Sequence, residues 1–268
     1  MRFGFVLENY GEFLDRHHLI ETAKWAEESG FSSIWATDHV LPPRINNFPR
    51  FNTITEAITT ISFLAGVTDR IKLGVSTLVL PLRNPILVAK QLTSLDYLTD
   101  GRVMMSFGAG LSEGEFGFMN MSFSNRGRRF DEGLELVKVL WSGKDTFKGR
   151  HYSFEDASFS PNDPDSHRIP IWIAGNSERA CRRAIKYADG WHPVNLQASE
   201  IIEKLEAWDI ETPSNGFEIA LRRTILDVSA LRPLLDSFES TLVSYVLLKL
   251  PREKKSLRQV ADDMASYV

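Results

Sequence analysis

The sequence is poor in the features that mark several specialised classes of protein. It has a single cysteine, so no disulfide can form within the chain, and a reducing cytosol is its simplest setting. No apolar run approaches the roughly 20 residues of a membrane-spanning helix. Lys and Arg number 31 against 35 Asp and Glu, so the net charge of -4 offers no broad attraction to nucleic acid or an anionic membrane. We therefore expect a cytoplasmic protein that acts on a small-molecule substrate.

The motifs of two common site types are also missing. There is no His-x-His or His-Glu-x-x-His pattern, and one cysteine cannot supply a thiolate cluster, so we expect no metal site. No G-x-G-x-x-G fingerprint follows the first apolar run, which disfavours an open nucleotide-binding sheet. The cysteine itself, Cys181, has Ala180, Ala184 and Ile185 as neighbours at helical spacing. That spacing favours a buried small side chain over a nucleophile.

The sequence does contain a regular alternation of strand-like and helix-like segments, which is typical of βα units that build a parallel sheet. The predicted strands cover residues 3–7, 33–37, 72–80, 103–107, 171–174, 191–195, 218–228 and 242–248. The predicted helices include one that ends at Gly30 and others at residues 54–66, 85–98, 128–141, 178–188, 199–208 and 255–267. Eight such units in 268 residues predict an α/β fold, a single (β/α)8 TIM barrel domain spanning residues 1–268. Residues 142–168, rich in Gly, Pro, Ser and Asp, form an irregular insertion before strand five.

In such a barrel the active site lies where strands end and βα loops begin. Asp38 and His39 follow the second predicted strand. An unperturbed histidine has a pKa of about 6.5, so it can take up and release protons near neutrality. Its place beside a carboxylate at the barrel mouth makes His39 the best candidate for a general acid or base. Lys249, at the end of the last strand, is the only candidate for an aldolase-like Schiff base, which is a weaker hypothesis.

A possible anion site follows the fifth strand, where a turn leads into a helix whose first backbone N–H groups are free to bind a phosphate. The turn consists of Gly175, Asn176 and Ser177. Three arginines follow it in the helix, namely Arg179, Arg182 and Arg183. Such a turn taken alone is more often structural. Three further arginines lie around the start of the helix predicted at 128–141, namely Arg126, Arg128 and Arg129. Such a run more often forms a solvated helix face than a ligand site.

Four segments together resemble the bacterial luciferase-like flavin oxidoreductases, and more narrowly the subgroup that uses the deazaflavin coenzyme F420. They are the pair DH at residues 38–39, LGVSTLVLPLRNPILVAKQLTSLDYLTDGRVMMSFGAG at 73–110, NRGRRFDEGLELVKVLWSG at 125–143, and PIWIAGNSERACRRAIKYADGW at 170–191. The resemblance covers most of the chain and thins after Trp208. It implies a (β/α)8 barrel with an excursion, a flavin-type cofactor across the carboxyl ends of the strands, and a homodimer.

The resemblance also implies roles for individual residues. His39 would be the acid or base beside the reacting carbon of the cofactor, and Glu113 an acidic residue near the substrate. Ser76 and Thr77 would form a non-prolyl cis peptide behind the ring. The remaining positions would bind the cofactor or its phosphate, and they are Asp38, Gly108, Ala109, Gly110, Gly175, Asn176 and Ser177. The loop after His39 lacks the Trp that sugar-phosphate dehydrogenase relatives place over their substrate, which puts that substrate class in doubt.

These expectations predict an oxidoreductase that uses F420 for hydride transfer to or from a small organic substrate. An FMN-dependent monooxygenase on the same scaffold is the nearest alternative, because the sequence does not separate F420 from FMN. A flavin-binding protein without catalysis is an alternative from another class, which the polar strand ends disfavour. A phosphosugar isomerase or aldolase would need a well-placed lysine or glutamate base and no flavin.

Overall fold

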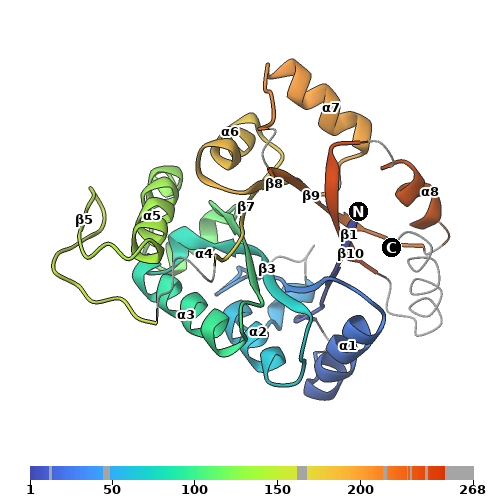
Figure 1. Ribbon diagram of the computed structural model, residues 1–268, viewed down its shortest axis with the longest axis horizontal. Helices are drawn as coiled ribbons and strands as arrows, with labels where there is room; N and C mark the ends of the chain where they lie inside the picture. The colour runs from blue at the N-terminus through green and yellow to red at the C-terminus, as the bar shows by residue number, and fades with distance from the viewer. Residues whose placement is uncertain are drawn as a thin grey trace.

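Eight parallel strands close into a barrel in the computed structural model, as Figure 1 shows. The structure describes residues 1–11, 14–44, 49–161, 168–213, 216–227, 229, 231–238 and 241–250. The barrel strands are β1 (Arg2–Val6), β2 (Ser33–Ala36), β3 (Lys72–Val79), β4 (Val103–Gly108), β7 (Ile171–Ala174), β8 (Gly190–His192), β9 (Glu218–Thr224) and β10 (Val243–Lys249). They follow one another around the barrel in chain order, and β10 pairs with β1 to close it. The predicted (β/α)8 barrel is confirmed.

Helices surround the barrel (Figure 1), and they are α1 (Arg16–Glu28), α2 (Ala57–Ala65), α3 (Pro85–Leu98), α5 (Arg126–Trp141), α6 (Glu178–Tyr187), α7 (Ala198–Ala207) and α8 (Leu231–Asp236). Their starts follow from local chemistry. The Asn84 side chain accepts a hydrogen bond from the Ile86 backbone at 2.9 Å, and Pro85 occupies the first turn, where its missing N–H costs nothing. Ser177 caps α6 in the same way by accepting from the Ala180 backbone.

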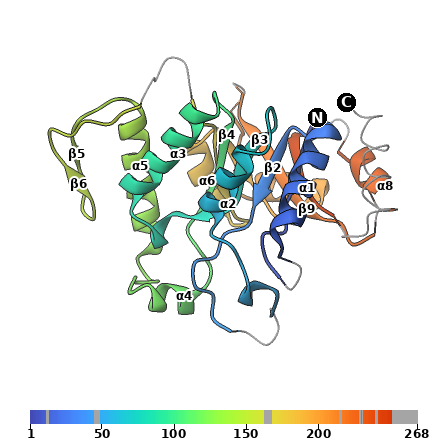
Figure 2. The same cartoon turned by 90° about the horizontal axis from the view of Figure 1, so that it is seen from below.

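The structure differs from the sequence-based expectation in its short elements. It adds the six-residue helix α4 (Glu113–Phe118) and the 3-10 turns η1 (Pro49–Asn52) and η2 (Leu80–Leu82), all too short to show a helical period. The insertion at 142–168 contains a hairpin of β5 (Phe147–Lys148) and β6 (Ser153–Phe154), which projects beyond α5 in Figure 2. The predicted strands at 191–195 and 218–228 end earlier than expected, and the predicted helix at 255–267 lies outside the described residues.

The barrel interior is packed with aromatic side chains rather than open. Trp35 of β2 and Trp172 of β7 stack with their ring centroids 5.0 Å apart, and the Tyr245 ring meets Trp172 edge to face at 5.0 Å. Gly74 of β3 makes room for this layer, because a Cβ there would lie 2.5 Å from the Trp35 ring. This layer supports the side chains at the carboxyl ends of the strands, where the site lies.

Two further findings concern the described residues. In that part of the chain no helix combines the length and apolar character needed to cross a bilayer. The same residues contain no group of three or more His, Cys, Asp or Glu side chains arranged to hold a metal ion.

Candidate active and cofactor-binding site

A large cavity opens at the carboxyl ends of the strands, on the side where Figure 2 shows α4 and the segment between β2 and α2. Its volume is about 1440 Å³, above the range of about 300 to 1,000 Å³ for most small-molecule pockets. All but one of the site residues expected from the sequence line it: Asp38, His39, Ser76, Thr77, Gly108, Ala109, Gly110, Gly175, Asn176 and Ser177. Glu113 does not. It lies exposed in the first turn of α4, so the structure does not bring it to the cavity.

His39 is held at the cavity by a glutamate that we did not expect, Glu115. The His39 Nδ1 atom lies 3.1 Å from Glu115 Oε2, and the Val40 and Leu41 backbone N–H groups donate to Glu115 Oε1 at 2.6 and 3.1 Å. Burial alone would raise the pKa of Glu115, but the hydrogen bonds from His39, Val40 and Leu41 outweigh it and hold the pKa below its usual range. Glu115 is therefore a carboxylate near neutral pH, and Nδ1 carries the proton that it accepts.

The dyad leaves the second ring nitrogen of His39, Nε2, free of that contact. The His39 side chain is 27% exposed, whereas that of Glu115 is 3% exposed. The Phe51 ring packs against the imidazole with centroids 4.7 Å apart. His39 is thus an oriented imidazole with one nitrogen committed to the protein and the other available for proton exchange.

Asp38 lines the cavity, but its carboxylate is occupied by protein partners. Arg83 binds it through both guanidinium nitrogens at 2.7 and 2.8 Å, and the Val79 backbone N–H donates to it at 2.9 Å. Arg83 also donates to Glu56 at 2.9 Å. Burial acts to lower the pKa of Arg83, yet the two carboxylates outweigh it and the pKa is raised, so Arg83 stays a cation. Asp38 therefore fastens the loop after β2 to the end of β3.

The peptide between Ser76 and Thr77 is cis, as the resemblance implied. The buried imidazole of His192 lies behind it, with Nδ1 against the Ala220 carbonyl and Nε2 2.8 Å from Ser76 Oγ. A carbonyl only accepts, so Nδ1 carries the hydrogen and the Ser76 hydroxyl donates to Nε2. Burial lowers the pKa of His192 to about 3, so it is neutral at physiological pH. Arg222 donates to the Ser76 carbonyl and, at 3.3 Å, to Thr37 Oγ1.

The turn expected to bind an anion is built partly for internal contacts. The Asn176 side chain donates to the Val194 carbonyl and accepts from the Val194 N–H, both at 2.8 Å, which ties the turn to the end of β8. Gly175 has a φ of +133°, a value that side chains with a Cβ rarely adopt. The Asn176 side chain therefore shapes the turn, and any anion would meet its backbone.

Reasoning from the sequence missed four residues that shape the cavity or hold the side chains lining it: Arg83, Glu115, His192 and Arg222. Two of them carried a signal. Ser112 and Glu115 form the Ser-x-x-Glu pattern of a helix start, which marks Glu115 as the third residue of a short helix. Arg222 and Arg223 are adjacent in a strand, so strand alternation requires one of them to face the barrel interior.

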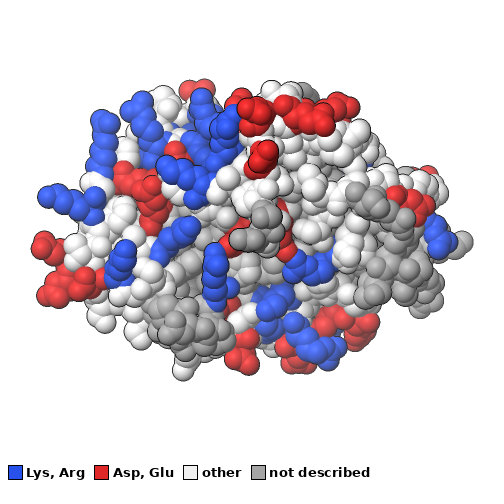
Figure 3. Space-filling model, turned by 45° about the horizontal axis from the view of Figure 1, so that its top comes forward, with Lys and Arg blue, Asp and Glu red and all other residues white. Residues whose placement is uncertain are grey.

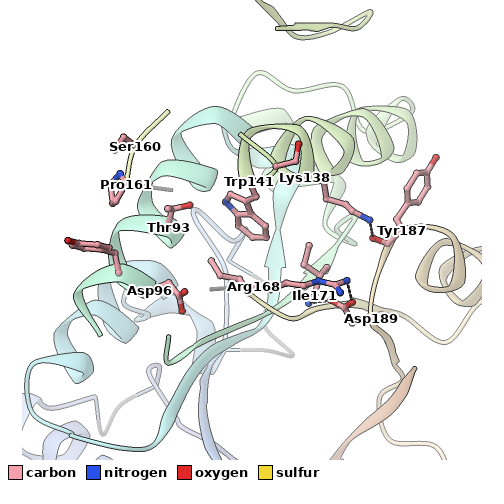
Figure 4. Close-up of a pocket in the computed structure, with 13 residues that line it drawn as sticks. Thr93, Asp96, Lys138, Trp141, Ser160, Pro161, Arg168, Ile171, Tyr187 and Asp189 are labelled. Atoms are coloured by element: carbon pink, nitrogen blue, oxygen red, sulfur yellow. Dashed lines mark hydrogen bonds and ion pairs between the residues drawn. The ribbon is translucent and has the colours of Figure 1, made fainter. Parts of the chain in front are cut away.

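A second cavity of about 520 Å³ lies at the amino-terminal end of β7, between the last turns of α3 and α5, as Figure 4 shows. Thr93, Trp141 and Arg168 are among its lining residues. None of the site residues expected from the sequence lines it. In a barrel of this kind, that end serves stability and the opposite end carries the chemistry.

The arrangement matches a known family. The family model of luciferase-like monooxygenases matches residues 2–225. The chain belongs to the luciferase-like monooxygenase family. An uncharacterised protein of Mycobacterium tuberculosis is 32% identical over 185 residues, which are 64% of this chain and 63% of that protein. The F420-dependent glucose-6-phosphate dehydrogenase of Kineococcus radiotolerans is 31% identical over 177 residues. That match covers 65% of this chain and 51% of the dehydrogenase, about half its length.

Solved structures share the barrel of this luciferase-like chain. A monooxygenase from Streptomyces bottropensis superposes with a TM-score of 0.79 at 17% identity, covering 100% of both chains. An F420-dependent secondary alcohol dehydrogenase, solved with an F420–acetone adduct, gives a TM-score of 0.70 at 20% identity over 99% of this chain and 90% of that one. At these identities the likeness shows the fold.

The residues of this luciferase-like chain fit a flavin-type group. The inner part of the cavity combines the hydroxyls of Ser76 and Thr77 with the apolar side chains of Val79 and Ile173, which suits a planar ring with polar edges. The outer part carries arginines from α5 and α6, which suits an anionic tail. Gly108 has a packing reason of its own, because a Cβ there would lie 2.7 Å from the Thr77 methyl group.

Proposed function

We propose that this protein is an oxidoreductase that uses coenzyme F420 for hydride transfer to or from a small organic substrate, with His39 as the acid or base. The observation that carries the proposal is the His39–Glu115 dyad, which presents an oriented imidazole at the edge of a cavity of about 1440 Å³. Bound F420 would supply or accept the hydride. The F420-dependent names of several relatives support the choice of cofactor.

The chain's own residues would handle the proton that accompanies the hydride. Glu115 holds Nδ1 of His39 in its protonated state, so Nε2 is the atom that gives a proton to the substrate oxygen or takes one from it. Asp38 and Arg83 keep the loop that bears His39 in place through the end of β3. Ser76, Thr77 and the backbone from Gly108 to Gly110 would contact the cofactor, while the turn from Gly175 to Ser177 would bind its phosphate. Glu113, which the sequence suggested as a substrate contact, has no role in this proposal, because its exposed side chain lies outside the cavity lining.

Titration of the purified protein with F420 and with FMN, followed by absorbance, tests the proposal. Saturable binding of F420 and turnover of an alcohol or carbonyl substrate would support it. Preferential binding of FMN with consumption of O₂ would favour the monooxygenase instead. Binding of a flavin with no turnover across a substrate panel would favour a binding protein without catalysis, and binding of neither cofactor would refute the proposal.

We further propose that the protein is a homodimer in the cytoplasm. The exposed side chains of Leu87, Tyr97 and Leu98 on α3 support it, because apolar groups gathered on one helix favour association. Sedimentation of the purified protein as a monomer at micromolar concentration would contradict the dimer.

A further inference from the structure

The second cavity has the size and the lining of a small-molecule site. Its volume of about 520 Å³ lies within the range of about 300 to 1,000 Å³ that such sites span. Figure 4 shows it between Thr93 of α3 and Trp141 of α5. It reaches Ile171, the first residue of β7, so it lies at the end of the barrel opposite to His39. Much of its lining is aromatic or aliphatic, namely Tyr97, Trp141, Ile169, Ile171 and Tyr187.

The charged side chains of the second cavity balance one another. Lys138 and Arg168 supply two positive charges, and Asp96 and Asp189 supply two negative charges. Arg168 pairs with Asp189, whose other oxygen accepts a hydrogen bond from the Ile171 N–H at 2.9 Å. The exposed surface over α5 and α6 differs, because Figure 3 shows Lys and Arg side chains gathered there. A charged ligand would therefore meet no surplus of opposite charge in the second cavity.

Other polar groups of this lining already have partners within the protein. The Lys138 ammonium donates to the Tyr187 carbonyl at 2.8 Å, and Asp96 accepts from the Val103 N–H at 3.0 Å. The Ser142 hydroxyl donates to a backbone carbonyl of α5 at 2.8 Å. A ligand that carried many polar groups would lose its bonds to water without gaining as many in this cavity. The lining therefore favours a ligand that is mostly apolar.

The hydroxyl of Thr93 is an exception. Its Oγ1 atom is buried and has no hydrogen-bond partner among the described residues. A threonine in a helix often bonds to the carbonyl four residues earlier, but here that carbonyl, of Ala89, accepts from the Trp141 indole N–H at 3.4 Å. A buried hydroxyl without a partner is unfavourable. Because Thr93 lines the cavity, a ligand group that bonded to this hydroxyl, directly or after a rotation about χ1, would remove that penalty.

We propose that the second cavity binds an uncharged, planar aromatic molecule that carries one hydrogen-bonding group, such as a phenol. Its ring would pack against Trp141 and Ile171, and its hydroxyl would bond to Thr93. The inference goes beyond the proposed function and does not depend on it. The lining of the second cavity contains neither His39 nor any residue expected to bind the cofactor.

Ligands that share a ring system and differ in one group test this proposal. The probes are a fluoronaphthol, the same fluoronaphthalene without the hydroxyl, and a fluoronaphthoate with a carboxylate in its place. Each is titrated into the purified protein and followed by fluorine NMR. Thr93→Val is the decisive variant, because valine has the shape of threonine and the hydroxyl that it removes makes no bond within the described protein, so folding is preserved. Thr93→Ser is the matched control, because it keeps the hydroxyl and loses one methyl group.

We expect the unmodified protein to bind the fluoronaphthol about fivefold more tightly than the fluoronaphthalene, which is the gain from one satisfied hydrogen bond. The Thr93→Val variant should lose this preference, and the Thr93→Ser variant should keep it. The fluoronaphthoate should bind the unmodified protein about tenfold more weakly than the fluoronaphthol, because its charge would enter an apolar cavity without a free cation.

Four results would overturn the proposal. Absence of saturable binding would show that the cavity takes no such ligand. An unchanged preference for the fluoronaphthol in the Thr93→Val variant would place the ligand elsewhere on the protein. Tightest binding of the fluoronaphthoate would assign the cavity to an anion. Affinity for the fluoronaphthol that falls as the protein concentration rises would show that a second copy of the chain fills the cavity instead.

Discussion

His39 and His192 both lie at the carboxyl ends of barrel strands. Both are held through Nδ1, His39 by a charged carboxylate and His192 by a neutral backbone carbonyl. Nδ1 of His39 contacts the carboxylate of Glu115, and the partly exposed His39 side chain lines the cavity. Nδ1 of His192 contacts a backbone carbonyl, and Nε2 accepts a hydrogen bond from the Ser76 hydroxyl. The ring is fully buried against the stacked rings of Trp35 and Trp172. The position of the first imidazole suits the proposed proton transfer, whereas the second imidazole is buried and neutral at physiological pH.

The partner of Nδ1 decides much of this difference. The Glu115 carboxylate accepts the Nδ1 hydrogen of His39 and orients that ring at the cavity. The Ala220 carbonyl accepts the Nδ1 hydrogen of His192 in the interior, where complete burial disfavours the charged form of the imidazole and lowers its pKa. Under the proposed function, His39 would take part in the chemistry, whereas His192 supports Ser76 from the interior.

The largest expected effect is on turnover at position 39. Replacing His39 by Ala should lower turnover about 10² to 10⁴-fold, the range for loss of a general acid or base, and should leave F420 affinity within a few-fold. Steady-state kinetics and a binding titration measure the two quantities. Unchanged turnover would remove His39 from the mechanism.

Replacing His192 by Phe should lower the free energy of unfolding. The ring volume is kept, but the Ser76 hydroxyl and the Ala220 carbonyl lose their partner, so we expect unfolding to become easier by about 2 to 4 kcal/mol. Urea denaturation measures this change, and His17→Phe at an exposed position serves as the control. A variant as stable as the unmodified protein would show that the buried hydrogen bonds of His192 do not support Ser76.

The pH dependence of stability sharpens the same contrast. The pKa of His192 is about 3 in the folded protein, against 6.5 for an unperturbed histidine, so below pH 6.5 the unfolded state binds a proton that the folded state excludes. Stability should therefore fall by about 1.4 kcal/mol per pH unit as the pH drops from 6.5 toward 3. Urea denaturation at several pH values should show a shallower decline in the His192→Phe variant. Equal slopes would contradict the low pKa.

The smallest expected effects are on turnover, and they distinguish Glu113 from Glu115. Replacing Glu115 by Gln should lower turnover about tenfold, because a neutral amide holds the Nδ1 hydrogen of His39 less firmly and orients the ring less well. Replacing Glu113 by Gln should change turnover less than about twofold, because that side chain lies outside the cavity. The reverse order of effects would restore Glu113 to the role that the sequence suggested.

The fold was predictable because βα alternation is a signal repeated along the whole chain, so an error at one strand end changes little. The site was predictable only in part. His39 was found by its position after a strand end, and Ser76 by the family resemblance. Glu115 was missed because it reaches the loop after the second strand from a six-residue helix, a contact across 75 residues that no local pattern reports. His192 is the second residue of the strand predicted at 191–195 and so did not stand at a predicted strand end, whereas β8 is three residues long and ends at His192.

The lone thiol has a practical consequence. Cys181 lies on the buried side of α6, a helix that also contributes arginine side chains to the lining of the large cavity, and burial raises the pKa of its thiol to about 11. The thiolate is then scarce at neutral pH, and alkylating reagents should leave this position untouched in the folded protein. A cysteine introduced on the outer face of α5 or α6 would be the reactive one. The natural chain is therefore already suited to carrying a single fluorescent or spin label beside the cavity.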